Sequence, residues 1–336
     1  MQPTMLKAEQ EGSGLSSPSF GQVRSIRPNI GITARRAKQI SSVLMIRDQR
    51  DQRKQEVAFN ARPFVLCGIP LRPVPKDQLT HKRRNGKFFL HIMAHPDFGL
   101  PFGQDRLIPI WVATLALRQN SRTVHFESAA QMLEFFRFPK DGRYYRRMVQ
   151  GFQRIFASTI FFGTEEQPVG SRLTDWARFH FFDQIHLWFS EPEKCSPSSP
   201  DASPNAITLS EAFYNEIDQH RVPMEREVVI ALANSPGVLD FYVWLAWKSW
   251  VLKTGKTSIP LFAPGGLREQ LGGRVHTEDR FLRRKINQWL RVIGAHWPQC
   301  PAVVSPDGQS LIVSSSKSSP ALHPVQMNLR SSCAHS

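Results

Sequence analysis

The sequence predicts an α+β protein made of two similar halves. An arginine-rich helix is written twice, as RYYRRMVQGFQRIF at 143–156 and as RFLRRKINQWLRVI at 280–293, at a constant offset of 137 residues (280 − 143). Each copy comes late in a similar string of predicted helices and strands. A segment rich in proline and serine, 191–206, separates the two strings. Together these observations predict tandem winged-helix (helix-turn-helix) domains related by a pseudo-twofold repeat.

Each copy of the helix has an apolar stripe and a polar face at the helical period. The first polar face holds Arg143, Arg146, Arg147, Gln150 and Arg154. The second holds, at the same spacing, Arg280, Arg283, Arg284, Asn287 and Arg291. The predicted apolar stripes are Tyr145, Val149, Phe152 and Phe156 in the first copy and Leu282, Ile286, Trp289 and Ile293 in the second.

Such a polar face suits a helix that reads the major groove of DNA. Arginine forks onto guanine edges and phosphates, and asparagine or glutamine onto adenine. A single helix of this kind is more often a solvated charged surface, but the same face occurs twice in the same context. We therefore interpret all ten residues as DNA-binding. Residues near each helix N-terminus are expected to reach bases, and Arg154 and Arg291 to hold phosphates.

The first half is predicted to begin with a helix at 33–57, which contains neither Gly nor Pro. Its second half is almost all charged residues and Gln, so the helix is expected to project or to pack on a partner. From Phe64 the chain is strand-like, in the runs 64–75 and 87–96. The winged-helix elements follow: helix 107–117, strand 122–126, helix 128–136, the arginine-faced helix 143–157, and a hairpin of 159–163 and 177–190 around a polar loop at 164–175.

The second half is predicted to repeat this order. Its elements are a helical region at 208–232, a buried helix at 237–252, a strand at 258–262, a short helix at 264–271, the second arginine-faced helix, and a hairpin of 302–304 and 310–313. The turn of this hairpin is Pro306-Asp307-Gly308. In each half the hairpin loop, or wing, is expected to lie on the DNA backbone or in the minor groove.

These elements divide the chain into five predicted parts. They are a disordered N-terminal segment at 1–32, a first winged-helix domain with its N-terminal helix at 33–190, a linker at 191–206, a second winged-helix domain at 207–314, and a disordered tail at 315–336. The linker has four prolines and four serines in 16 positions, a composition that cannot build a core.

The charge balance favours a polyanionic partner. Lys plus Arg number 43 against 28 Asp plus Glu, which gives a formal net charge of +15. No apolar stretch reaches the roughly 18 residues of a membrane span, and the N-terminus lacks the apolar core of a signal peptide. Because the basic residues lie on helices with aromatic cores, nucleic acid is favoured over a membrane surface. We expect a cytoplasmic protein that associates with the nucleoid or with plasmid DNA.

The sequence offers no chemistry for an enzyme, a cofactor or a metal site. The cysteines are scattered without zinc spacing, at Cys67, Cys195, Cys300 and Cys333, and are expected to be reduced. Gly255-Lys256-Thr257 resembles the end of a phosphate-binding loop, but Trp250 stands where that loop needs its first glycine. No pair of carboxylates and no Ser–His or Cys–His arrangement stands out, and the chain has no His-x-His motif of a nicking enzyme.

The segment GLPFGQDRLIPIWVATLA at 99–116 is distinctive. Together with the strand that follows, the pair Phe161-Phe162 and the segment FHFFDQIHLWFS at 179–190, it resembles plasmid-encoded RepA-type replication initiators. The resemblance covers roughly 60–300 and is most specific over 99–163. It implies theta replication from direct repeats (iterons) at a plasmid origin. It also implies paired winged helices, autorepression as a homodimer, origin binding as a monomer, and recruitment of the host replicative helicase and the host initiator.

From these observations we expect a protein that initiates plasmid replication by binding double-stranded DNA at origin repeats, without catalytic activity. Two alternatives remain open at this stage. One is a sequence-specific transcriptional repressor with no role at an origin. The other, which is disfavoured, is a DNA nickase or primase. The helix at 33–57 is the candidate element for switching between monomer and dimer.

Overall fold

The computed structural model of the chain describes residues 33–128, 130–166, 173–186, 205–252, 254–271 and 278–315. Its helices are α1 (Ala34–Asp51), α2 (Arg62–Leu66), the short 3-10 helix η1 (Gly103–Arg106), α3 (Leu107–Gln119), α4 (Ala130–Phe135), α5 (Gly142–Phe156), α6 (Glu211–His220), α7 (Arg226–Leu232), α8 (Pro236–Val251), α9 (Leu267–Gln270) and α10 (Asp279–His296). Its strands are β1 (Val57–Asn60), β2 (Thr80–Asn85), β3 (Phe88–Met93), β4 (Thr123–Phe126), β5 (Thr159–Glu166), β6 (Leu173–His180), β7 (Phe182–His186), β8 (Asn205–Leu209), β9 (Val222–Glu225), β10 (Lys256–Pro260), β11 (Ala302–Val304) and β12 (Ser310–Ser314).

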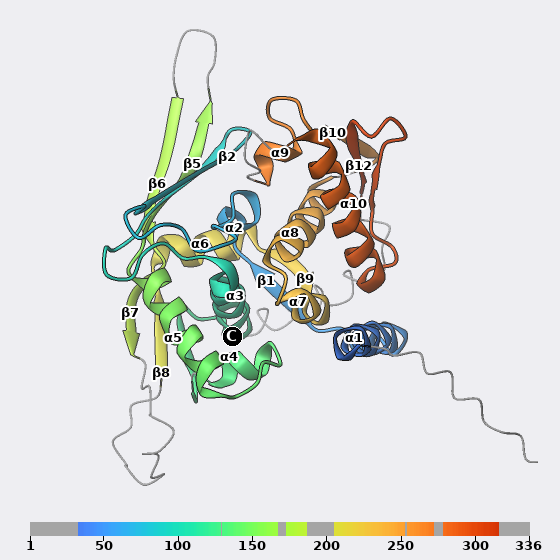
Figure 1. Ribbon diagram of the computed structural model, residues 1–336. Helices are drawn as coiled ribbons and strands as arrows, with labels where there is room; N and C mark the ends of the chain where they lie inside the picture. The colour runs from blue at the N-terminus through green and yellow to red at the C-terminus, as the bar shows by residue number, and fades with distance from the viewer. Residues whose placement is uncertain are drawn as a thin grey trace, which may run out of the picture.

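The α+β class predicted from the sequence is confirmed. In the described part of the chain the strands form antiparallel sheets with the orders β2-β3-β5-β6, β4-β8-β7, β10-β12-β11 and β1-β9. Figure 1 shows α3, α4 and α5 on one side of the molecule and α9, α10 and the β10-β12-β11 sheet on the other. The pair β1-β9 lies between them, and all eight of its residues are buried.

One apolar helix lies at the centre of each half. The helix α3 is buried around nearly its whole circumference, as is α8, where Phe241 and Trp244 are among the most buried large side chains. A helix that is apolar on all sides must be surrounded by protein, and this accounts for both segments. The buried hydrophobic residues of both halves form one continuous cluster. The two halves therefore share a core.

From α8 onward, the second half places its elements in the predicted order. The strand β12 pairs with β10 on one side and with β11 on the other. In the first half the hairpin β5-β6 does not pair with β4. It extends the sheet of β2 and β3 instead, while β4 pairs with β8. The β5-β6 hairpin projects from the body of the molecule in Figure 1.

Several boundaries differ from the sequence prediction. The run 64–75 was expected to be a strand, but Pro63 sits at the start of α2, where its missing N–H costs nothing. The helix expected at 33–57 ends at Asp51. Val57, the last residue of the predicted range, begins β1 instead.

The region 208–232, expected to be helical, has two strands as well as two helices. The strand β8 alternates buried and half-buried residues. The strand β9 pairs with β1, from Val57↔Glu225 (225 − 57 = 168 residues apart) to Asn60↔Val222 (222 − 60 = 162 residues apart). The predicted linker 191–206 lies outside the described residues except for its last two, which begin β8 and pair within the first half. The predicted disordered segments 1–32 and 315–336 also lie outside the described residues, apart from Ser315.

None of the helices in the described ranges combines the length and the apolar composition needed to cross a membrane. Cys67 is buried and Cys300 half-buried, and both are free thiols. Burial raises the pKa of the Cys67 thiol to about 12, so this cysteine is protonated near neutral pH.

Candidate nucleic-acid interface

The helix α5 carries the first predicted reading face. Asp141 is its N-cap, and its carboxylate accepts the Tyr144 N–H at 2.8 Å. The buried side of α5 consists of Met148, Gly151, Phe152 and Ile155. The predicted apolar stripe is therefore wrong in part: Phe152 is buried, but Phe156 is 44% exposed. The helix is rotated about its axis relative to the prediction, and Gly151 shows why.

Gly151 allows α5 to press against η1 and α3. A Cβ added at this position would lie 2.8 Å from Asp105 Oδ1 and 3.1 Å from Ile108 Cδ1. Any other residue would push the helix away. The cost of a glycine in a helix interior, roughly 1 kcal/mol relative to alanine, is thus offset by a close approach of two elements.

Arg154 is fixed by the same contact. Its Nε and Nη2 donate to the two oxygens of Asp105 at 2.7 and 2.9 Å, and its guanidinium lies 4.6 Å from the centre of the Phe102 ring. Asp105 also accepts the Phe102 N–H at 2.9 Å and is 4% exposed. Arg154 was expected to hold a phosphate. Its guanidinium instead binds Asp105 through both Nε and Nη2, so Arg154 positions α5 on η1.

The other polar residues of α5 surround an open cleft. This cleft, about 520 Å³ in volume, is lined by all five residues of the first predicted face and by Arg72, Phe102, Gln104, Asn234 and Pro236, among others. Arg143, Arg146, Arg147 and Gln150 are exposed. Arg147 donates to Gln104 Oε1 at 2.8 Å, and Gln104 Nε2 donates to Asn234 Oδ1 at 2.9 Å. A polar chain therefore connects the first reading face to the second half.

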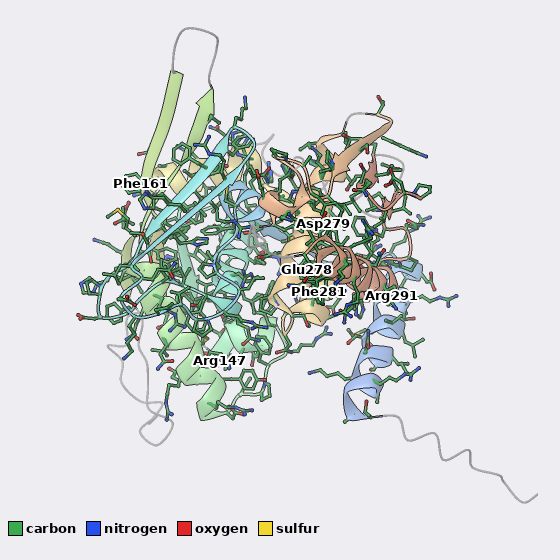
Figure 2. The ribbon with its side chains drawn as sticks, turned by 45° about the horizontal axis from the view of Figure 1, so that its top comes forward. Arg147, Phe161, Glu278, Asp279, Phe281 and Arg291 are labelled. Carbon is green, nitrogen blue, oxygen red and sulfur yellow. The ribbon has the colours of Figure 1, made fainter. Side chains whose placement is uncertain are left out.

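The helix α10 carries the second predicted face, and its apolar stripe matches the prediction. Leu282, Ile286 and Ile293 are buried, and Trp289 is half-buried against the core. On the opposite side, the exposed residues of the predicted face are Arg280, Arg284, Asn287 and Arg291. Figure 2 shows Arg147 on α5 and Arg291 on α10, on separate parts of the surface.

Arg283, the remaining predicted reader on α10, faces the hairpin. Its Nε donates to the Gly308 carbonyl at 2.9 Å, and its guanidinium lies 5.4 Å from the centre of the Phe262 ring. Gly308 has a φ of 67°, a conformation that favours glycine, and it ends the turn between β11 and β12. Arg283 therefore holds the hairpin turn against the helix.

The N-terminal end of α10 is nearly neutral. Glu278 and Asp279 precede the arginines (Figure 2), as favoured by the helix dipole. Arg280 pairs with Glu278 at 2.6 Å, and Arg268 pairs with Asp279. The guanidinium groups of Arg280 and Arg284 lie 5.0 and 5.2 Å from the centre of the Phe281 ring. The uncompensated positive charge of this face therefore begins at Arg284.

Two further basic residues, which the sequence analysis did not single out, lie beside or on these helices. Arg72 is exposed and lines the α5 cleft. Lys285 projects from α10, with its Nζ 4.9 Å from the centre of the Trp289 ring. Burial, and then the positive charge of Arg72, lowers the pKa of Lys285. The sequence feature that could have pointed to Arg72 is its position as a basic residue within the proline-rich run Pro70 to Pro75.

The arrangement offers cations and amides for binding. Among the described residues, no group of three or more His, Cys, Asp or Glu side chains could hold a metal ion. Exposed Arg, Gln and Asn on two helices can contact phosphates and the edges of bases.

Residues 145–260 match the family described as "Plasmid encoded RepA protein". This match confirms the resemblance to plasmid RepA proteins predicted from the sequence. The RepA-matching segment starts on α5 and ends with β10, so it includes the buried helix α8. No curated protein matches the chain.

Two solved structures show a distant likeness. "Crystal structure of SeMet derivatives of domain2 and domain 3 of RctB" has a TM-score of 0.46 and 12% identity, covering 68% of this chain and 84% of that one. "Crystal structure of the RctB domains 2-3, RctB-155-483" has a TM-score of 0.45 and 9% identity, covering 74% of this chain and 95% of that one.

Proposed function

We propose that this protein initiates plasmid replication by binding specific double-stranded DNA at its own origin. One observation supports this above others: the five polar residues of α5 surround a single basic cleft, in a region that matches plasmid RepA proteins from Tyr145 onward. The net charge of +15 favours the same partner.

Each half is proposed to act as a winged helix. In the second half, α8, β10, α9 and α10 precede the hairpin β11-β12, and Arg283 ties that hairpin to the reading helix. In the first half, α3, β4, α4 and α5 precede β5 and β6, although the hairpin belongs to a larger sheet. The readers are then Arg143, Arg146, Arg147 and Gln150 on α5, and Arg280, Arg284, Asn287 and Arg291 on α10.

Two reading helices in one chain predict a long, asymmetric site. Helices in successive major-groove segments lie about one helical turn apart, roughly 10–10.5 bp, so one monomer would cover about 20 bp. The two faces differ in sequence, as at Gln150 and Asn287, so the two parts of the site differ too. Asymmetric sites in direct repeats suit monomers that bind side by side, whereas a twofold dimer requires inverted repeats.

The helix α1 is the proposed element for dimerisation and autorepression. It carries exposed apolar side chains, with Ile40 44% and Leu44 60% exposed. Its other end is fixed to the body, because Arg50 pairs with Glu225 at 2.7 Å and donates to the His296 carbonyl. Recruitment of the host replicative helicase and the host initiator completes the proposal, in which the protein has no catalytic activity.

A footprint on the plasmid that encodes the protein tests this proposal. We expect protection of several direct repeats beside an AT-rich stretch, with loss of protection for Arg146→Ala combined with Arg284→Ala. Arg221→Ala, which removes a partly exposed arginine outside both helices, serves as the matched control and should protect the repeats as the wild type does. Protection of one inverted repeat at a promoter alone would instead indicate a repressor.

The enzyme alternative has a separate test. The protein is incubated with supercoiled plasmid and a divalent metal ion, and the products are separated on a gel. We expect the plasmid to stay supercoiled. Relaxed circles would indicate a nickase and would contradict the proposal.

A further inference from the structure

The segment 69–73 crosses between the two halves and is tied to both. The Pro70 carbonyl accepts the Gly103 N–H at 2.9 Å, next to the contact between η1 and α5. The Ile69 carbonyl accepts Arg106 Nη2 at 2.9 Å. With prolines at two of its five positions, the segment has few backbone conformations to choose from. Its place in the molecule is therefore well defined.

Arg106 links this segment to the second half. Its guanidinium is 5% exposed and binds the Asp240 carboxylate on α8 through Nε at 2.6 Å and Nη2 at 2.9 Å. The same side chain also donates to Gly103 and to Ile69. One buried arginine thus fixes the segment, η1 and α8 relative to one another.

Arg72 is held at the surface between the two reading helices. Toward α5 it lines the cleft that includes Arg143 and Arg146. On the side of α10, the neighbouring residue Leu71 and Trp289 of α10 both lie close to Gly237 at the start of α8. A Cβ added at Gly237 would lie 3.5 Å from Leu71 Cδ1 and 2.8 Å from the Trp289 ring. Arg72 is therefore an exposed cation that lines the cleft beside α5 and is near enough to α10 for its positive charge to lower the pKa of Lys285.

The geometry of the DNA duplex determines which groove would face the protein at this position. When two reading helices enter successive major-groove segments on one side of the duplex, the minor groove faces the protein between them. A minor groove in A·T-rich DNA is narrow and has an enhanced negative potential, which attracts arginine. A lysine suits this position less well, because a strongly hydrated ammonium loses more solvation on entry than a guanidinium does.

We propose that Arg72 enters the minor groove at the centre of the site and makes the protein prefer A·T base pairs there. The inference rests on the proposed function, because it assumes that α5 and α10 bind one DNA duplex. It adds a specificity determinant outside both reading helices, at base pairs that neither helix touches.

The test uses the full-length protein and two forms of a footprinted repeat, one with A·T and one with G·C at its central four base pairs. Affinities are measured by fluorescence anisotropy for the wild type, Arg72→Lys, Arg72→Ala and the control Lys76→Ala. Lys76 is exposed on the same stretch of chain, so Lys76→Ala removes one positive charge, as Arg72→Ala does. We expect the wild type and Lys76→Ala to prefer the A·T centre roughly tenfold.

Arg72→Ala should bind the A·T centre more weakly and lose the preference, and Arg72→Lys should lose most of it while keeping the charge. If Arg72→Ala retains the wild-type preference, or if Arg72→Lys behaves as the wild type, the inference is overturned. Equal wild-type binding to both centres also overturns it and leaves the proposed function standing. Absence of wild-type binding to either DNA would instead mean that the proposed function has failed.

Discussion

Asp105 and Arg154 form a two-pronged ion pair beside Gly151, with nitrogen–oxygen distances of 2.7 and 2.9 Å. The pair joins η1 to the last turn of α5, and both side chains are largely buried. A charge-assisted, bidentate pair fixes orientation as well as distance. The orientation of Arg143, Arg146 and Arg147 around their cleft therefore depends on a contact made by Arg154, a residue of the same polar face.

The close approach at Gly151 predicts that alanine there is destabilising. An added Cβ meets Asp105 at 2.8 Å, so Gly151→Ala should lower the free energy of unfolding by about 1–3 kcal/mol, despite the better helix propensity of alanine. Gly294 on α10 is the matched control, because a Cβ there meets nothing within 4 Å. Gly294→Ala should raise stability by up to about 1 kcal/mol. Urea unfolding of both variants checks this, and a stabilised Gly151→Ala would contradict the packing described.

DNA binding should depend strongly on salt. Two basic helices, the hairpins and Arg72 displace counterions from the DNA, and with about 6–10 phosphate contacts the affinity should fall on the order of 10³-fold between 50 and 200 mM salt. The measurement is a series of binding isotherms for one repeat. A nearly flat response would mean that the basic faces lie away from the DNA.

His81 should make stability depend on pH. Burial and the positive charge of Arg83 lower the pKa of His81 to about 4, against an ordinary value of 6.5. The unfolded chain takes up this proton near pH 6.5 and the folded chain only near pH 4, so stability is fully present above pH 6.5 and is lost as the pH falls. The slope for one proton is at most about 1.4 kcal/mol per pH unit. Unfolding measured from pH 7.5 to 4.5 should show this slope in the wild type and a smaller one in His81→Gln; equal slopes would contradict it.

The pattern of apolar residues predicted the elements that pack through their own side chains. It gave α3, α8 and the stripe of α10, because Leu282, Ile286 and Ile293 recur at the helical period. It placed the wrong residues on the buried side of α5. There the helix packs closely because Gly151 has no side chain, and a pattern of apolar side chains cannot predict such a contact.

Contacts between distant parts of the chain left no local trace in the sequence. The strands β1 and β9 pair residues that lie more than 160 positions apart, as at Asn60↔Val222 (222 − 60 = 162), and Arg154 meets Asp105 across 49. Arg283 has the spacing of a reader but meets Gly308. The sequence therefore predicted which residue types face solvent on α5 and α10, and the structure was needed to separate those exposed to a ligand from those that hold the fold together.

The central claim is that α5 and α10 read two different parts of one site. It is tested by selecting binding sites from random DNA with the wild type, Arg146→Ala, Arg284→Ala and the control Arg221→Ala. Loss of a bidentate base contact costs about 1–3 kcal/mol at the base pair concerned and relaxes specificity there. The selected sequences show directly which positions each variant no longer specifies.

We predict an asymmetric wild-type site of about 20 bp. Arg146→Ala should relax base pairs in one half of this site, Arg284→Ala should relax base pairs in the other half about one helical turn away, and Arg221→Ala should leave the site unchanged. If Arg146→Ala and Arg284→Ala relax the same base pairs, or if neither alters the selected sequence, the account of two reading helices is contradicted.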